Sequence, residues 1–110
     1  MEKVLLFSFA TENIKVTIEA YFDKVENLII GGYDIGKTVE EYWGDSDYEY
    51  MSTIPKEEVK KLYDLFNLSP GSKKELLSIL QSKYNTNTCY SEIQNLLGHH
   101  NIRYEGFSWM

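Results

Sequence analysis

The period of the hydrophobic pattern changes at Pro55, and this change restricts the possible fold more than any other feature of the chain. Before Pro55, apolar and polar residues alternate with a period of two, which is typical of strands that bury one face. After Pro55, apolar residues recur every three or four positions, which is typical of amphipathic helices. Strands followed by helices, without alternation of the two, indicate an α+β fold.

The first half of the chain predicts strands and one secure hairpin. Residues 4–9 are apolar on both faces, which favours a central strand. The alternation that starts at Ile14, the polar turn over residues 23–27 and the apolar run that follows predict a hairpin from Ile14 to Tyr33. Gly31-Gly32 inside the return strand predicts a bulge or a close approach of another group to the backbone.

A short helix and a further strand are predicted between the hairpin and Pro55. Thr38 and Glu41 match a capping box and Gly44 offers a helix stop, so a helix of about two turns is expected between them. Residues 45–53 then alternate again. This alternation predicts a strand on which Tyr48 and Tyr50 face inward.

The second half predicts three helices and a final strand. The first helix begins at Pro55, the second begins at a capping box of Ser72 and Glu75, and the third ends at Gly98. The predicted buried stripes are Val59, Leu62, Tyr63 and Phe66; Leu76, Leu77, Leu80 and Tyr84; and Tyr90, Ile93, Leu96 and Leu97. Residues 102–109 predict a last strand that returns to the sheet and covers Phe107 and Trp109. We therefore expect a single domain, residues 1–110, with a mainly antiparallel sheet of four or five strands and three helices on one face.

Composition favours a cytoplasmic protein. The chain has 110 residues, and 43% of them are hydrophobic, which is enough for a core without disulfides or metals. Cys89 is the single cysteine, which excludes an internal disulfide framework and favours a reducing compartment. The N-terminal apolar run is broken at Ser8, and no stretch reaches the ~20 apolar residues of a membrane span. We therefore expect no targeting segment and no membrane association.

The negative charge of the chain is concentrated in its first half. Seventeen acids and eleven bases give a net charge of -6, which argues against a nucleic-acid binder that uses a basic face. Residues 11–50 carry ten acids and three bases, whereas residues 51–110 carry six acids and seven bases. Between Asp34 and Glu49, six acids and one base are interleaved with large aromatic residues.

Acidic groups beside aromatic anchors are typical of a protein-recognition surface, in which aromatics supply affinity and charges supply steering and specificity. The alternative is a solvated outer face that keeps the chain soluble. Clustered like charges repel one another, and a solubility role would spread them, so we favour recognition. The predicted partner-binding residues are Glu40, Glu41, Tyr42, Trp43, Asp45, Asp47 and Glu49. Of these, Trp43, together with Tyr42, is the expected anchor.

Catalytic and metal sites are less well supported by the sequence. Asp45, Asp47 and Glu49 offer oxygen ligands for Mg²⁺ or Ca²⁺, but carboxylates in line on a flat strand diverge, and calcium-loop spacing is missing. Cys89 could act as a nucleophile with His99 or His100 as its base. No nucleophile signature surrounds Cys89, so we expect a buried structural thiol and two loop or cap histidines. No phosphate-binding glycine motif is present. The chain is therefore expected to bind without catalysis, cofactor or metal.

The chain also resembles a known class of proteins. The segment Gly44-Asp45-Ser46-Asp47-Tyr48-Glu49-Tyr50, followed by Ile54-Pro55-Lys56-Glu57-Glu58-Val59, a run of helices and a closing aromatic strand, is similar to small bacterial immunity proteins paired with contact-dependent growth inhibition toxins. The resemblance implies a non-enzymatic inhibitor that binds the toxic domain of its cognate effector, usually a nuclease, inside the cell. Two alternatives are an acidic adaptor or inhibitor of another basic protein, and a small metal-dependent enzyme.

Overall fold

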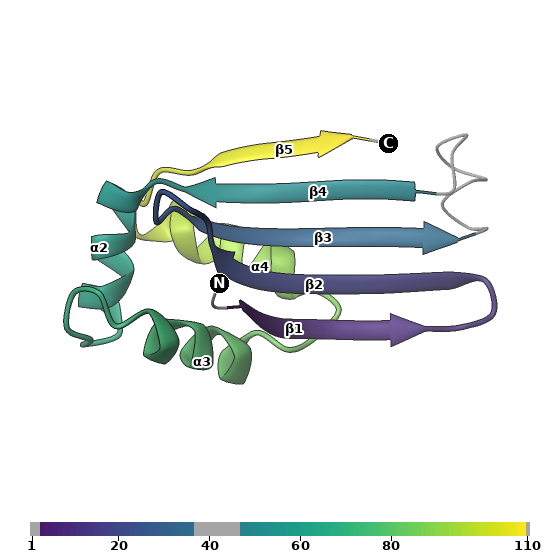
Figure 1. Cartoon of the computed structure of the whole chain (residues 1–110), viewed down its shortest axis with the longest axis horizontal. Coiled ribbons are helices and arrows are strands. Elements are labelled where there is room, and N and C mark those ends of the chain that lie inside the picture. The colour runs from purple at the N-terminus through teal and green to yellow at the C-terminus, as the bar shows by residue number, and fades with distance from the viewer. Residues whose placement is uncertain (1–2, 37–46, 110) are drawn as a thin grey trace.

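The strands follow one another across one antiparallel sheet in the order of the chain, β1-β2-β3-β4-β5 (Figure 1). They are β1 (Lys3–Ala10), β2 (Ile14–Phe22), β3 (Leu28–Gly36), β4 (Asp47–Ile54) and β5 (Glu105–Trp109). The computed structural model describes residues 3–36 and 47–109, and for Asp47 and Trp109 it describes the backbone alone. The α+β fold with a five-stranded antiparallel sheet is confirmed. The predicted short helix between Thr38 and Gly44 lies outside the described residues.

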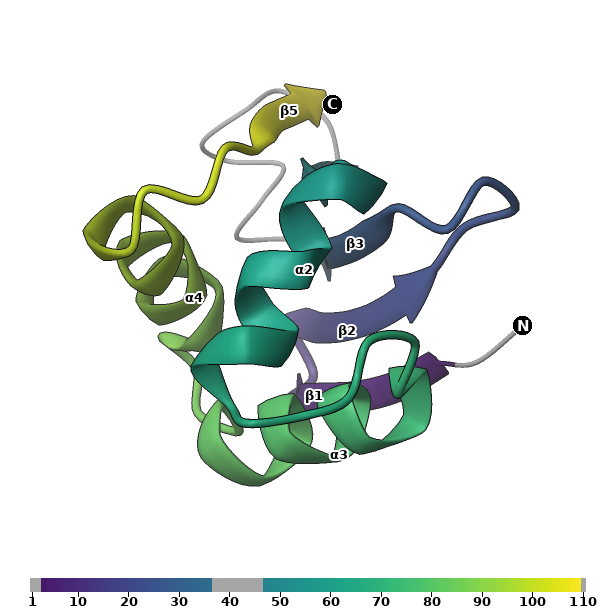
Figure 2. The ribbon, with the colours of Figure 1, turned by 90° about the vertical axis from the view of Figure 1, so that its left-hand side faces the viewer.

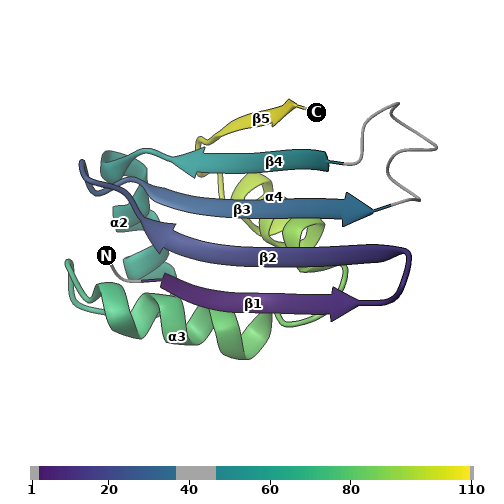
Figure 3. The same cartoon turned by 45° about the vertical axis from the view of Figure 1, so that its right-hand side comes forward.

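Three helices within the described part of the chain cover one face of the sheet. They are α2 (Lys56–Leu65), α3 (Lys73–Lys83) and α4 (Cys89–His99). Helix α3 contacts β1 and β2, and α4 contacts β3. Figure 2 views the helices from the end of the sheet that carries α2. Figure 3 shows that the strands extend well beyond the helical layer at the other end, where β1 and β3 finish and β2 and β4 begin.

The predicted hairpin is confirmed, and its turn is held by one carboxylate. Asp23 Oδ1 accepts hydrogen bonds from the backbone N–H groups of Val25 (3.0 Å) and Asn27 (2.8 Å). Glu26 then adopts a positive φ of 68°. Asn27 Oδ1 also accepts a hydrogen bond from the N–H of Lys56 at 3.0 Å, so the turn caps the first free donor of α2. The hairpin and the helical layer are therefore joined at this end of the sheet.

The core lies between the helix-facing side of the sheet and the predicted helix stripes. Ile18, Ala20 and Phe22 of β2 and Leu28 and Ile30 of β3 are buried there. The helices contribute Val59, Leu62, Tyr63, Leu76, Leu77, Leu80, Cys89, Ile93 and Leu97. Phe66, Tyr84, Tyr90 and Leu96 of the predicted stripes are half-buried and pack against the edge of this cluster. The period of 3.6 thus identified the covered side of each helix.

The prediction that residues 4–9 form a central strand is wrong, because β1 is an edge strand. A bulge between Leu5 and Phe7 shifts the register, so Leu6 turns into the core while Leu5 and Phe9 stay 48% and 50% exposed. Gln81 of α3 donates a hydrogen bond to the Leu5 carbonyl at 3.0 Å and fixes the helix against this bulge. β1 therefore has apolar residues on both sides because the bulge changes which side of the sheet successive side chains point to.

Two helices are each closed by an asparagine that follows the last helical turn. Asn67 and Asn101 have φ values of 57° and 56°, the left-handed conformation that closes a helix. After α4, Asn101 N–H bonds the Gly98 carbonyl (3.3 Å) and Ile102 N–H bonds the Leu97 carbonyl (2.8 Å), which is a Schellman motif. The predicted stop at Gly98 is therefore wrong, and the helix continues to His99. Ser72 occupies the predicted N-cap of α3, but its side chain makes no capping hydrogen bond.

The last strand pairs with β4, as predicted, but it does not bury its aromatic side chain. Phe107 aligns with Met51 on the side of the sheet away from the helices and is 64% exposed. The expectation that Phe107 would be covered is wrong, because β5 forms the second edge of the sheet and no described helix lies over that side.

Candidate functional site

The structure describes few of the predicted partner-binding residues. Glu40, Glu41, Tyr42, Trp43 and Asp45 lie outside the described residues. Asp47 begins β4, where its backbone aligns with Ile35, and its side chain is not described. Glu49 is the predicted residue whose side chain the structure places, and it is half-buried.

Glu49 lies on the side of the sheet opposite the helices, which we name the open face. Three adjacent rows on β2, β3 and β4 form a regular grid there, because cross-strand partners in an antiparallel sheet lie side by side. The rows are Thr17, Tyr33 and Glu49; Glu19, Gly31 and Met51; and Tyr21, Ile29 and Thr53. Gly31 occupies the centre of this grid and has no side chain.

The missing side chain leaves a hollow of about 210 Å³ over Gly31. No atom outside the neighbouring residues lies within 4 Å of the position that a Cβ on Gly31 would take. Two tyrosines, Met51 and two carboxylates line the hollow: Tyr21, Tyr33, Glu19 and Glu49. A half-polar hollow with aromatic walls and acidic groups suits a positively charged group.

An intramolecular cation already uses part of this lining. The ammonium group of Lys3 lies 3.1 Å from Glu19 Oε1 and 5.1 Å from the centre of the Tyr21 ring. Glu19 Oε2 takes part in none of the hydrogen bonds found among the described residues. This arrangement leaves a second carboxylate oxygen beside the hollow.

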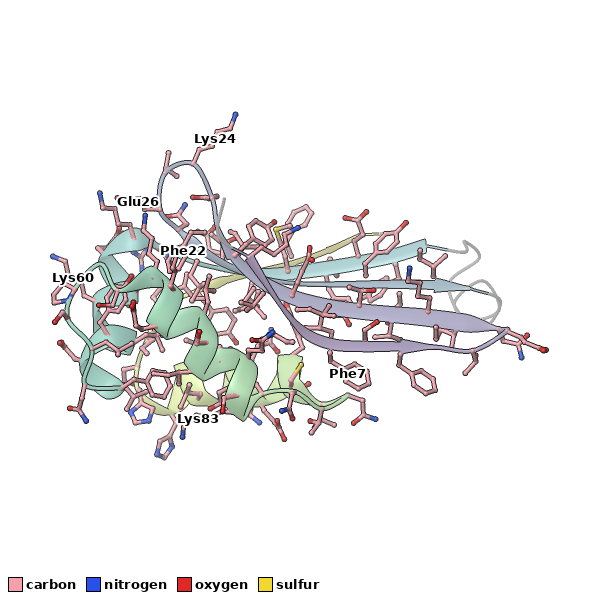
Figure 4. The ribbon with its side chains drawn as sticks, turned by 60° about the horizontal axis from the view of Figure 1, so that its bottom comes forward. Phe7, Phe22, Lys24, Glu26, Lys60 and Lys83 are labelled. Carbon is pink, nitrogen blue, oxygen red and sulfur yellow. The ribbon has the colours of Figure 1, made fainter. Side chains whose placement is uncertain are left out.

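The helix-facing side of the sheet also has an uncovered region, where the strands extend past the helices (Figures 3 and 4). A groove of about 660 Å³ lies there, and its apolar lining includes Phe7, Phe9, Ile14 and Val16. Figure 4 shows Phe7 on the underside of the projecting strands. Asp34 brings one carboxylate into this apolar groove.

Asp34 and Tyr50 form the polar centre of the groove. Tyr50 Oη donates a hydrogen bond to Asp34 Oδ1 at 3.2 Å. Burial raises the pKa of the Asp34 carboxyl above its ordinary value, and the bond from Tyr50 partly opposes that rise. The Tyr50 ring packs edge-to-face on Tyr90 of α4 at 4.7 Å and lies 5.6 Å from the ring of Tyr48. The predicted inward orientation of Tyr50 is therefore confirmed, and half-buried Tyr48 lies beside it.

Close-packed Gly32 makes room for the Tyr50 ring. A Cβ on Gly32 would overlap Tyr50 Cε2, Cζ and Oη. The register between β2 and β3 runs without interruption through both glycines. Of the two structures predicted for Gly31-Gly32, the close approach is therefore confirmed at Gly32, and the bulge is wrong.

A third cavity, a pocket of about 520 Å³, lies between β4, β5 and α4. Tyr90 and Gln94 line this pocket, and Tyr90 Oη shares a hydrogen bond of 2.9 Å with the hydroxyl of Ser52, which is fully buried. Gln94 Nε2 donates to the same Ser52 Oγ at 3.2 Å. These bonds satisfy a buried hydroxyl and attach α4 to the sheet, so we interpret this network as structural.

Several acids at the end of the molecule that carries α2 are held in ion pairs, although Asp64 of α2 is in none of those among the described residues. At the end that carries α2, Glu26 is held by Lys56 (2.8 Å) and Lys73 (2.9 Å). Glu57 and Glu58 are paired there with Arg103 and Lys61. Figure 4 shows Lys24, Glu26 and Lys60 gathered at this end.

The acids near the opposite end of the sheet lack such partners. Glu12, Asp34 and Glu49 take part in none of the ion pairs among the described residues. Lys15 is a base at this end of the sheet, and it too is absent from those pairs. We name this part of the molecule the acidic end. It comprises the strand termini from which the acidic connection of residues 37–46 begins and to which it returns.

Cys89 is fully buried, in agreement with its predicted structural role. Burial raises the pKa of its thiol, which disfavours the thiolate that a nucleophile requires. His99 and His100 lie at the exposed end of α4 with their rings 5.2 Å apart.

Within the described ranges, no three His, Cys, Asp or Glu side chains are grouped as a metal site would require. None of the described helices has the length and apolar character of a membrane span.

Sequence reasoning missed Asp34, Glu19 and Gly31 as site residues. Asp34 carried a usable signal, since alternation places it on the same face of β3 as buried Ile30, and a carboxylate on an apolar face is unusual. The hollow at Gly31 had no local signal, because it depends on the alignment of three strands.

Comparison of the chain with protein-family models, curated proteins and solved structures found no match.

Proposed function

We propose that this chain is a bacterial immunity protein that binds and neutralises a cognate toxin domain in the cytoplasm, without catalysis of its own. The expected toxin is a nuclease with a basic surface. The observation that supports this proposal is the position of Glu12 and Glu49: they lie near the acidic end, beside the acidic connection of residues 37–46, and take part in no ion pair among the described residues. Carboxylates outside internal ion pairs are available to the cations of another protein, whereas Asp34 is engaged by the hydroxyl of Tyr50.

The chemistry of a nuclease explains why such a surface would inhibit it. A nuclease carries a basic groove for phosphate, and an acidic protein can occupy that groove in place of the substrate. A net charge of -6 also keeps the inhibitor away from nucleic acid. Long-range attraction between the acidic end and the groove speeds encounter, and it weakens as salt screens the charges. We therefore propose steric and electrostatic occlusion of the toxin.

The proposed contacts combine charge with aromatic area. Glu40, Glu41, Asp45, Asp47 and Glu49 supply carboxylates for lysine and arginine residues of the toxin, and Trp43 with Tyr42 supplies the anchor. The described part of this surface is Glu49, which lies on the open face one row away from exposed Phe107.

Charge reversal tests this proposal. Replacement of Asp45, Asp47 and Glu49 by lysine changes the formal net charge from -6 to zero. We expect the fold to be retained and the affinity for the toxin domain encoded by a neighbouring gene to fall by at least about 100-fold, measured by calorimetry and by survival on co-expression. The matched control replaces three exposed acids of the helical layer by lysine, with the same change in net charge: Asp64, Glu75 and Glu92.

The control should retain most of the affinity and protect cells. If both triple variants bind the toxin domain with equal affinity, the position of the replaced acids is unimportant. The acidic end would then not be the binding surface. If the chain binds a basic protein at the acidic end but that protein has no toxic activity, the adaptor alternative replaces the immunity role. If the candidate toxin kills cells equally with and without the chain, the immunity role is wrong.

A further inference from the structure

We propose that the hollow over Gly31 is a socket for one arginine side chain of the partner protein. This inference rests on the proposed function, because it identifies a contact within the partner-binding surface. It adds a site on the open face that is separate from the acidic connection.

The socket is formed by the register of the sheet. Glu19 and Met51 flank Gly31 on the neighbouring strands, and Tyr33 and Glu49 form the next row towards the acidic end. A volume of about 210 Å³ equals that of about seven water molecules at ~30 Å³ each, which is room for a guanidinium group and part of its aliphatic stem. Carboxylates therefore lie on both sides of a hollow that opens away from the helices.

Lys3 shows that this lining binds a cation. Its ammonium group already contacts Glu19 at 3.1 Å and lies over the Tyr21 ring at 5.1 Å. Lys3 comes from the edge of the sheet and approaches Glu19 from the β1 side. The socket presents the same pair of chemical groups, a carboxylate and a tyrosine ring, on its other side through Glu49 and Tyr33.

Arginine suits this site better than lysine. A planar guanidinium stacks on tyrosine rings and donates to two carboxylates through its fork of N–H groups, whereas an ammonium group is a compact and strongly hydrated charge. Met51 adds a flexible apolar wall for the stem of the side chain. The chemistry of the lining thus favours an arginine of the partner.

The socket can be filled without damage to the fold. Gly31 has no atom within 4 Å of a built Cβ and does not need the left-handed conformation, so valine fits there and favours a strand. Gly31→Val should therefore fold as stably as the natural chain and occupy the hollow. Gly106→Val is the matched control, since Gly106 is also a strand glycine with open space at its Cβ but aligns with Ser52 on the helix-facing side.

A single-arginine peptide provides the probe. The peptide acetyl-Gly-Gly-Arg-Gly-Gly-amide is titrated into ¹⁵N-labelled protein, with the neutral citrulline peptide and the lysine peptide as comparisons. We expect the arginine peptide to shift the amide resonances of Glu19, Gly31 and Glu49, the lysine peptide to bind several-fold more weakly, and the citrulline peptide to have no effect. Gly31→Val should weaken arginine binding by about tenfold or more, and Gly106→Val should leave it unchanged.

Glu49→Gln is a second variant that keeps the shape of the socket and removes one charge, and it should weaken the arginine peptide several-fold. The inference is wrong if the arginine peptide binds Gly31→Val as well as the natural chain, or if its shifts avoid Gly31. The toxin domain separates this failure from that of the proposed function. If the toxin domain binds the natural chain and Gly31→Val with equal affinity, the socket is unused and the immunity role stands. If the toxin domain binds neither of these two proteins, the immunity role fails whatever the peptide shows.

Discussion

Neighbouring glycines in β3 should respond in opposite ways to the same substitution. Gly31 and Gly32 differ by one position, so a methyl group on Gly31 enters the open hollow, whereas a methyl group on Gly32 meets the ring of Tyr50. That ring is held by its hydrogen bond to Asp34 at 3.2 Å and by its edge-to-face contact with Tyr90 at 4.7 Å. Gly32→Ala must therefore displace Tyr50 from both contacts.

The size of the difference follows from these contacts. Loss of a part-buried hydrogen bond costs about 1 kcal/mol, and loss of an aromatic pair costs about 1 kcal/mol. Replacement of glycine by alanine stabilises a compatible site by about 0.4–1 kcal/mol, because the unfolded chain loses freedom. We therefore expect Gly31→Ala to raise the free energy of unfolding by about 0.5 kcal/mol and Gly32→Ala to lower it by about 1–2 kcal/mol.

Urea denaturation of the two variants measures this difference directly. In a Tyr50→Ala background the obstacle to a methyl group on Gly32 is gone, so the cost of Gly32→Ala should disappear, while the effect of Gly31→Ala should persist. Equal free energies of unfolding for the two alanine variants would refute the assignment of the strand faces. A cost of Gly32→Ala that is unchanged without the Tyr50 ring would refute the proposed clash.

Two further predictions concern polar contacts between the sheet and the helical layer. Hydrogen bonds from Lys56 and Lys73 lower the pKa of Glu26 to about 2, so the stability it contributes is present above its ordinary pKa of 4.5 and is lost as the pH falls towards 2. Carboxyl NMR titration should find a low titration midpoint for Glu26 in the natural chain and an ordinary midpoint in the Lys56→Ala/Lys73→Ala variant. A Glu26 midpoint that is the same in both proteins would contradict the ion pairs. Tyr90→Phe removes the bond to buried Ser52 and should lower the free energy of unfolding by about 0.5–1.5 kcal/mol in urea, and no change would show that the bond is not formed.

Local patterns predicted the elements that depend on local interactions. The β2–β3 hairpin follows from alternation and from the polar turn around Asp23, whose carboxylate binds the turn itself. The three helices follow from their apolar stripes. Helix ends were less predictable, because Asn101 rather than Gly98 takes the left-handed conformation, and either residue type can close a helix.

Features that depend on the whole sheet were not predictable from the pattern. Residues 4–9 resemble a central strand, yet the bulge at Leu6 lets an edge strand use apolar residues on both sides. The hollow at Gly31 exists because Glu19 and Met51 happen to align with it on two other strands. The acidic recognition surface stays a prediction, since most of its residues lie outside the described ranges; the structure adds that Glu12, Asp34 and Glu49 take part in no ion pair of the described residues.

The central claim is that the chain binds its partner through the acidic end rather than through the helices. Cross-saturation NMR of the complex with the toxin domain tests this claim most directly, because it identifies the amides that lie against the partner. We predict the strongest signal loss at Glu49, at neighbouring residues of the open face and in the connection between β3 and β4. Signal loss confined to α2, α3 and α4 would contradict the account.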